Sequence, residues 1–164
     1  NSGQALRTFW GVLAGAEEVG LWGSKAYSAA HIDEPIGVGL ESDFGADRIW
    51  RFESNFVETN EDLHKRLAQA VARFGVANST IVATGGADIN IARDQKTAFI
   101  DLQQDGTRDF DLHHTPDDTL DKIDVAQLRQ NVAVWTTVAG IHANEETSIQ
   151  TGALIKAAPD TMSE

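Results

Sequence analysis

Two adjacent carboxylates, Glu17 and Glu18, stand directly after an apolar run of the sequence. Like charges at this distance repel, which raises the pKa of one of them or destabilises the fold unless a cation lies nearby. With a divalent cation, one carboxylate can bind the ion while its neighbour takes a proton from a water molecule that the ion has acidified. The alternative is a pair of solvated acids at the start of a helix, where the helix dipole favours negative charge. The pair alone leaves both possibilities open.

A second group of reactive side chains lies in residues 113–119, with the sequence HHTPDDT. Neutral imidazole is the commonest metal ligand in proteins, and a nearby carboxylate often orients it. We expect one of the two histidines to bind metal and the other to pack beside it or support it. Asp43 and Asp88 stand after predicted strands, and Asp43 by itself is more typical of a turn residue.

The hydrophobic pattern predicts strands that alternate with helices, in a single domain over residues 1–164. We expect strands at residues 8–16, 38–40, 79–83 and 97–102, and helices at 20–31, 59–74 and 124–140. Thr59 and Asp124 are the expected N-caps. Residues 8–16 are apolar in almost every position, which is typical of a central strand. Residues 145–164 lack periodicity and could form a flexible tail.

This order of elements predicts an α/β fold with a mixed, mostly parallel sheet and helices on both faces. In such sheets ligands bind beyond the carboxyl ends of the strands. All the candidate residues follow or flank predicted strands: Glu17, Glu18, Asp43, Asp88, His113 and His114. We therefore expect them to share one end of the sheet.

Composition narrows the possible partners. The formal charge of −12 comes from 25 acidic against 13 basic residues, which disfavours nucleic acid because binding it requires the neutralisation of phosphates. No apolar run approaches the roughly 20 residues that a membrane span needs. The chain contains no cysteine. Any metal must therefore be held by carboxylates and imidazoles.

Four segments, taken in order, resemble the co-catalytic zinc exopeptidases, a family that includes bacterial leucyl-type aminopeptidases and carboxypeptidase Q. The segments are residues 16–24 (AEEVGLWGS), 41–43 (ESD), 85–90 (GGADIN) and 113–119 (HHTPDDT). The resemblance extends over about residues 7–142, the C-terminal part of such a catalytic domain. It implies a sheet of the zinc-exopeptidase type.

The resemblance also implies a role for each matching residue. Glu17 would be the general base, Glu18 and His114 would bind one zinc ion, and Asp43 would bind a second. Two further residues match positions near the family's active site and would have a supporting role: Asp88 and His113. The substrate would be a dipeptide or the end of a short peptide, cut by an amino-, carboxy- or dipeptidase activity. Relatives are commonly exported, so the family suggests a secreted or periplasmic protein.

Part of the family's pattern precedes this chain. A histidine on an upstream strand and a bridging aspartate complete the family's metal site, so we expect N-terminal strands to be missing and the isolated chain to be largely inactive. An unpaired sheet edge would favour association into a homo-oligomer. The rival hypothesis is a non-catalytic α/β binding domain or a degenerate peptidase-like domain.

Overall fold

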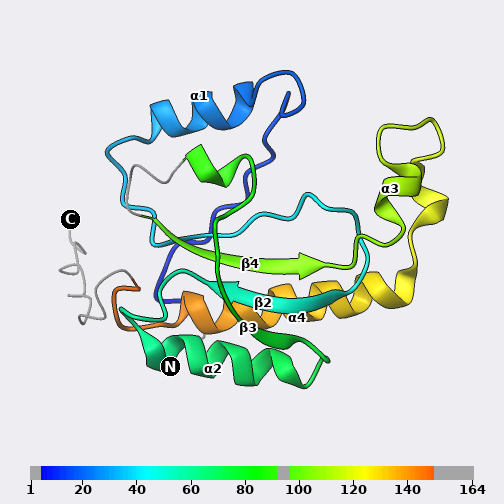
Figure 1. The fold of residues 1–164 in the computed structure, drawn as a ribbon. Helices are drawn as coiled ribbons and strands as arrows, with labels where there is room; N and C mark the ends of the chain where they lie inside the picture. The colour runs from blue at the N-terminus through cyan, green and yellow to red at the C-terminus, as the bar shows by residue number, and fades with distance from the viewer. Residues whose placement is uncertain (1–4, 92–96, 150–164) are drawn as a thin grey trace, which may run out of the picture.

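The computed structural model describes residues 5–91 and 97–149. Within them the chain forms an open four-stranded sheet with helices packed around it (Figure 1). The strands are β1 (Val38–Gly39), β2 (Ile49–Ser54), β3 (Ala77–Val82) and β4 (Ala98–Gln104). The helices are α1 (Trp22–Ala30), α2 (Glu61–Ala72), α3 (Asp109–Leu112), the 3-10 helix η2 (Leu120–Lys122) and α4 (Val125–Ala143).

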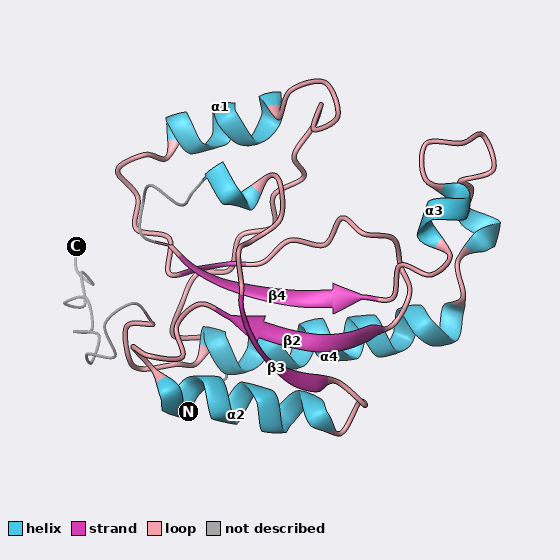
Figure 2. Ribbon diagram, viewed as in Figure 1, coloured by secondary structure: helices cyan, strands magenta, loops and turns pink. Residues whose placement is uncertain are grey.

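The sheet has the strand order β1-β4-β2-β3. β1 pairs with β4 in parallel and β2 pairs with β3 in parallel, while the central pair β2 and β4 is antiparallel. The strands lie between α1 and α2 (Figure 2). The prediction of a mixed, mostly parallel α/β sheet is therefore confirmed.

One of the two central strands, β2, was not predicted from the sequence. Its inner side chains Ile49 and Phe52 are fully buried, but Arg51 and Glu53 alternate with them and obscure the apolar pattern. Glu53 is only 2% exposed, and it pairs with Arg51 (Nε to Oε1, 2.8 Å) and accepts a hydrogen bond from Gln103 at 3.0 Å. The buried Glu53 carboxylate is tolerated in the sheet because Arg51 of the same strand neutralises it and Gln103 of β4 donates a hydrogen bond to it.

The core lies between the sheet and the helices α2 and α4. The predicted apolar face of α2 is correct, since Leu63, Leu67 and Val71 are completely buried. Val134 and Val138 of α4 reach the same core. Asp124 caps α4 as predicted, because its carboxylate accepts the N–H groups of residues 126 and 127. These two helices support the sheet, and the candidate site residues lie in turns and loops outside its strands.

The predicted N-cap of α2, Thr59, is wrong by one residue. The side chain of Asn60 accepts the N–H of Leu63 at 3.1 Å, whereas the Thr59 hydroxyl donates back to the carbonyl of Phe56. Asn60 also donates from its amide nitrogen to the Thr147 hydroxyl at 3.1 Å. It therefore links the start of α2 to the segment that follows α4.

Replacing Asn60 by alanine is expected to lower the free energy of unfolding by about 1 kcal/mol, because an N–H of the first turn loses its acceptor. Urea denaturation measures the change, and Glu58→Ala, at an exposed site just before the helix, is the matched control. A loss for Asn60→Ala no larger than that for Glu58→Ala would contradict the capping role.

The predicted central strand at residues 8–16 is not a strand in the structure. The segment is extended but pairs with none of the described strands. Its apolar side chains are exposed as a result: Leu13 is 100% and Phe9 65% exposed. An apolar run is buried only where neighbouring strands and helices cover it. Among the described residues no strand pairs with this segment, and α1 covers it only in part, where Tyr27 and the C-cap residue His31 pack against Trp10.

The segment predicted as a tail begins in contact with the core. Glu145 and Ile149 are buried, and Thr147 contacts Asn60. Residues 150–164, the rest of that segment, lie outside the described residues.

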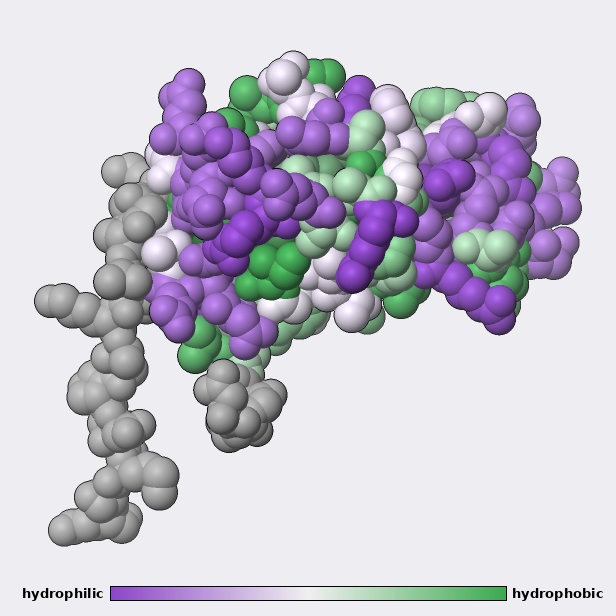
Figure 3. Space-filling model, turned by 90° about the horizontal axis from the view of Figure 1, so that it is seen from below, coloured by the Kyte–Doolittle hydropathy of each residue, from purple (hydrophilic) through white to green (hydrophobic). Residues whose placement is uncertain are grey.

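The surface agrees with the acidic composition. The face on the side of α2 is mostly hydrophilic, with smaller apolar areas between the polar ones (Figure 3). Among the described residues, no helix has both the length and the apolar character that crossing a bilayer demands.

Candidate metal centre

A tight turn at residues 17–20 presents the Glu17-Glu18 pair. The carbonyl of Glu17 accepts the N–H of Gly20 at 3.0 Å and that of Leu21 at 2.9 Å. Ala16 and Leu21, on either side, have left-handed backbones (φ 61° and 58°). Such conformations cost energy in residues with a side chain, and they persist where the surroundings impose them.

Helix α1 fixes this turn from the other side. The N–H of Gly23 donates to the carbonyl of Gly15 at 2.9 Å. A Cβ on Gly23 would lie 2.5 Å from the backbone nitrogen of Gly15. The first turn of the helix can therefore approach the chain before Glu17 only because residue 23 is glycine.

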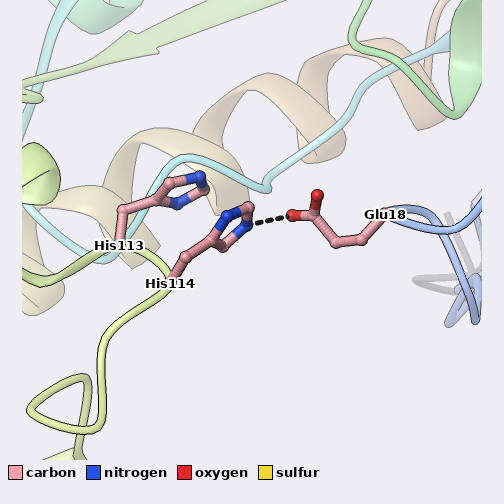
Figure 4. Close-up of side chains that lie close together, drawn as sticks. All are labelled: Glu18, His113 and His114. Carbon is pink, nitrogen blue, oxygen red and sulfur yellow. Dashed lines mark hydrogen bonds and ion pairs between the residues drawn. The ribbon is translucent and has the colours of Figure 1, made fainter.

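The two histidines leave the end of α3. The N–H of His113 donates to the carbonyl of Asp109 at 2.7 Å, and Thr115 donates to Leu112 at 2.9 Å. Between them His114 adopts a left-handed backbone, with φ 60°. The helix has already ended at Leu112, and the side chain of His114 points toward Glu18 (Figure 4).

Glu18 and His114 meet across the gap between these two turns. His114 Nε2 lies 2.6 Å from Glu18 Oε1, although 96 residues separate them in the sequence. The His113 ring stacks on that of His114, with centroids 3.7 Å apart. One ligand atom from each of the three side chains lies within 4.8 Å of the others, and all three residues are exposed.

These three residues fit a zinc ion by their chemistry. Imidazole nitrogen and carboxylate oxygen are the ligands that zinc accepts where cysteine is absent. Zinc bonds of about 2.1 Å in tetrahedral geometry place two ligand atoms about 3.4 Å apart. The Glu18 and His114 atoms would need to separate by only about 0.8 Å to admit an ion. Rotation of two exposed side chains is sufficient for that.

Glu17 lies in a second, purely acidic group. Its pKa is raised, first by loss of hydration and then by repulsion from Glu18, Asp43 and Asp88, with His114 acting weakly in the opposite direction. The structure thus brings both Asp43 and Asp88 within electrostatic reach of Glu17. Asp43 is exposed and is not part of the three-residue group of possible ligands. Three carboxylates close to a fourth repel its negative charge, and a bound cation would relieve that repulsion.

The loop at residues 84–90 is held by two carboxylates that sequence reasoning did not single out. Asp101 on β4 accepts the N–H of Thr84 at 2.8 Å and that of Gly85 at 3.1 Å. At the other end, Glu41 accepts the N–H of Ile89 at 2.8 Å. Together they fix the loop that carries Asp88. The signal in the sequence was an acidic residue shortly after a strand for Glu41 and one inside an apolar strand for Asp101.

Glu41 is held tightly against this loop. Burial raises its pKa, the N–H of Ile89 lowers it in part, and repulsion from Asp88 and Asp43 raises it further. A Cβ on Gly86 would overlap the Glu41 carboxylate, so a larger residue there would displace that side chain from its present position. The carboxylate therefore works as a hydrogen-bond acceptor for the loop.

Replacing Glu41 by alanine is expected to speed hydrogen exchange at the Ile89 amide by about tenfold or more, because local opening of the loop becomes easier. Exchange measured by mass spectrometry or NMR tests this, and amides of α2 serve as the internal control. Glu41→Gln retains an acceptor oxygen and should show a smaller increase. Equal exchange in Glu41→Ala and wild type would contradict the role of Glu41.

Comparison with known proteins supports the resemblance seen in the sequence. The model of peptidase family M28 matches residues 7–139, from before the Glu17-Glu18 turn to the last turns of α4. The chain belongs to peptidase family M28. No curated protein sequence gave a significant match.

A solved structure is similar to this M28 chain in both fold and sequence. It is the crystal structure of a peptidase M28 precursor from Shewanella amazonensis SB2B, with 36% identity and a TM-score of 0.76. The match covers 90% of this chain but only 33% of that protein. The M28 chain therefore spans about a third of the length of this relative.

The M28 match includes all the residues to which the resemblance gave roles. Glu18 and His114, for which the resemblance implies a shared zinc ion, lie in contact. His113, expected in a supporting role, offers a third ligand atom within 4.8 Å of those of Glu18 and His114. Asp43 and Asp88 lie on the side of Glu17, apart from the histidines.

Proposed function

We propose that this M28 chain carries the catalytic base and part of the metal site of a zinc-dependent exopeptidase. The observation that supports this most is the contact between Glu18 and His114, made directly beside Glu17 by two turns far apart in the sequence. Solvated acids at a helix start, the alternative left open by the sequence, give no reason for a histidine to be held against Glu18 by a left-handed backbone.

Glu17 is the residue that would move the proton. Its raised pKa favours a carboxylate that can accept a proton and later release it to the leaving amine. It stands next to Glu18 in one turn, so a water molecule near the metal ligands would lie within its reach. A side chain this close to the ligands, yet outside the group of three, suits a base better than a ligand.

Glu18 and His114 would hold one zinc ion, with His113 in support, while Asp43 would contribute to a second ion and Asp88 would support that side. When bound, zinc acidifies water and polarises the carbonyl of the peptide bond. The residues of this chain would orient that metal and exclude competing geometries. A dipeptide or the end of a short peptide is the proposed substrate.

Hydrolysis of short peptides tests this function. The assay uses the polypeptide that the gene encodes, including any residues on either side of these 164, with dipeptides and tripeptides whose amino or carboxyl end is blocked. We expect hydrolysis that a chelator abolishes and zinc restores. The blocked end that prevents cleavage distinguishes an aminopeptidase from a carboxypeptidase.

The 164 residues alone are expected to hydrolyse little or nothing, because the resemblance implies metal ligands outside them. Hydrolysis by the longer polypeptide that resists chelation would contradict the proposed function. Hydrolysis by the 164 residues at the rate of the longer polypeptide would contradict only the proposal that their metal site is incomplete.

We propose that the protein is exported from the cytoplasm. The solved relative is described as a precursor, a term used for proteins that are processed after synthesis. Fractionation of producing cells followed by immunoblotting tests this, and recovery in the cytoplasmic fraction alone would contradict it.

A further inference from the structure

Helix α3 carries a carboxylate, that of Asp109, which is not among the candidate site residues. Its backbone carbonyl accepts the N–H of His113 at 2.7 Å. Residues four apart in a helix lie one turn from each other on the same face. His113 Nδ1 accordingly lies 3.9 Å from Asp109 Oδ2, and the Asp109 side chain is only 15% exposed.

The Oδ2 atom of Asp109 is buried without a hydrogen-bond donor. Among the residues that the structure describes, none donates to this atom. The neighbouring cation, Arg108, pairs with Asp47 instead, with its Nε 2.9 Å from the carboxylate of that residue. A buried carboxylate oxygen that has lost water and gained no donor costs free energy.

His113 can supply the missing donor. A normal hydrogen bond would require Nδ1 of His113 and Oδ2 of Asp109 to approach each other by about 1 Å. The His113 side chain is 46% exposed, so a small rotation of its ring can achieve this. The Nδ1–H group of His113 would then satisfy the buried oxygen.

The other side of Asp109 faces the turn that follows Asp43. Gly45 has a left-handed backbone (φ 69°), and its N–H donates to the carbonyl of Asp43 at 3.2 Å. A Cβ on Gly45 would lie 3.3 Å from Asp109 Oδ1. Asp109 is thus held between the turn after Asp43 and the ring of His113, which belong to the two sides of the candidate metal centre.

We propose that Asp109 is a positioning residue of this centre, which accepts a hydrogen bond from Nδ1–H of His113 and so fixes the orientation and the tautomer of that ring. The proton on Nδ1 leaves the lone pair of the neutral imidazole on Nε2, the form in which a histidine can face a cation. Partners that hold histidines in this way beside a metal typically contribute about 10–100-fold to metal affinity. Asp109 would act through His113, which stacks on His114.

The tautomer of His113 is the first readout. The inference rests on the proposed function because it concerns the same metal centre, but the hydrogen bond can be observed without metal or substrate. The full gene product is prepared with isotopically labelled histidine, freed of metal and studied by NMR in alkaline buffer, where imidazole is neutral. We expect the His113 signal, identified by its loss in His113→Ala, to show the proton on Nδ1.

Variants of Asp109 test the cause of this tautomer. In Asp109→Ala the signal should shift toward the form with the proton on Nε2, because the acceptor is gone. Asp109→Asn retains an acceptor oxygen and should keep the proton on Nδ1.

Zinc titration of the full gene product is the second readout. Asp109→Ala should lower zinc affinity about tenfold, the loss expected for His113→Ala, because Asp109 acts through that ring. It should cause no further loss in a protein that already carries His113→Ala, since residues that act as one unit are not additive. The matched control is Asp111→Ala, which removes an exposed carboxylate from the same turn of α3 and should change zinc affinity much less.

Three outcomes would overturn the proposal. One is a His113 proton on Nε2 in the metal-free protein, or a tautomer that Asp109→Ala leaves unchanged. Another is additive losses of zinc affinity in the double variant, which would mean that Asp109 acts independently of His113. The third is an equal loss in Asp111→Ala, which would assign the effect to charge or to the stability of α3.

Failure of the proposed function is distinguishable from these outcomes. It would show as hydrolysis that resists chelation, or as zinc binding that Glu18→Ala leaves unchanged, while the metal-free protein still shows the His113 proton on Nδ1.

Discussion

Replacing Glu17 by glutamine is expected to lower the turnover number for peptide hydrolysis by about 10²–10⁴-fold, the usual contribution of a general base. Glutamine preserves the size and polarity of the side chain but cannot accept the proton. Because Glu17 lies outside the group of possible metal ligands, KM and zinc affinity should change little. The measurement is steady-state kinetics of the full gene product on a short peptide.

The control for this experiment is Glu58→Gln, which removes a carboxylate from an exposed position far from the site in sequence. It should retain wild-type turnover. A Glu17→Gln variant with undiminished turnover would remove Glu17 from the mechanism. Loss of zinc affinity in parallel with turnover would instead make Glu17 a ligand and contradict its assignment as the base.

The elements that could be predicted from the sequence were those whose pattern is local. The buried face of α2 could be predicted from the helical spacing of Leu63, Leu67 and Val71. Its end could be predicted from Gly75, whose backbone is left-handed with φ 79°. β4 is recognisable because most of its residues are apolar and buried. In these cases a residue's neighbours along the chain determine its environment.

The elements that could not be predicted depend on partners distant in the sequence. β2 can bury Glu53 because the carboxylate pairs with Arg51 and accepts a hydrogen bond from Gln103 on β4, a contact that no local pattern reveals. Residues 8–16 illustrate the opposite error. Their apolar character predicts a buried central strand, but no described strand pairs with them and most of their large side chains are exposed.

The candidate site could likewise be predicted only in part: its residues from the sequence, but not their geometry. Glu17, Glu18 and His114 could be selected from the sequence because their residue types suit metal chemistry and their order resembles a known family. The sequence could not give their geometry: the left-handed backbone of His114 and the stacking of His113 upon it arise from how α3 ends. Nor could it show that Glu41 and Asp101 hold the loop of Asp88 by accepting backbone N–H groups.

Zinc affinity is expected to fall at least about 100-fold in His114→Ala and in Glu18→Ala, because loss of a direct ligand exceeds the 10–100-fold cost of losing a residue that only orients one. His113→Ala should weaken binding by about tenfold, since His113 supports the His114 ring by stacking on it. Isothermal titration with zinc at neutral pH measures all three. His31→Ala removes a histidine that pairs with Glu34 elsewhere and is the matched control.

The relative size of these losses in zinc affinity shows whether His113 is a metal ligand or a supporting residue. A loss for His113→Ala as large as that for His114→Ala would make both imidazoles ligands of the ion, together with Glu18. The three ligand atoms permit this because they all lie within 4.8 Å of one another. Equal zinc binding by wild type and Glu18→Ala would contradict the ligand assignment altogether. The 2.6 Å contact between Glu18 and His114 would then be a simple hydrogen bond between two loops, and the carboxylates around Glu17 would need another source of neutralising charge.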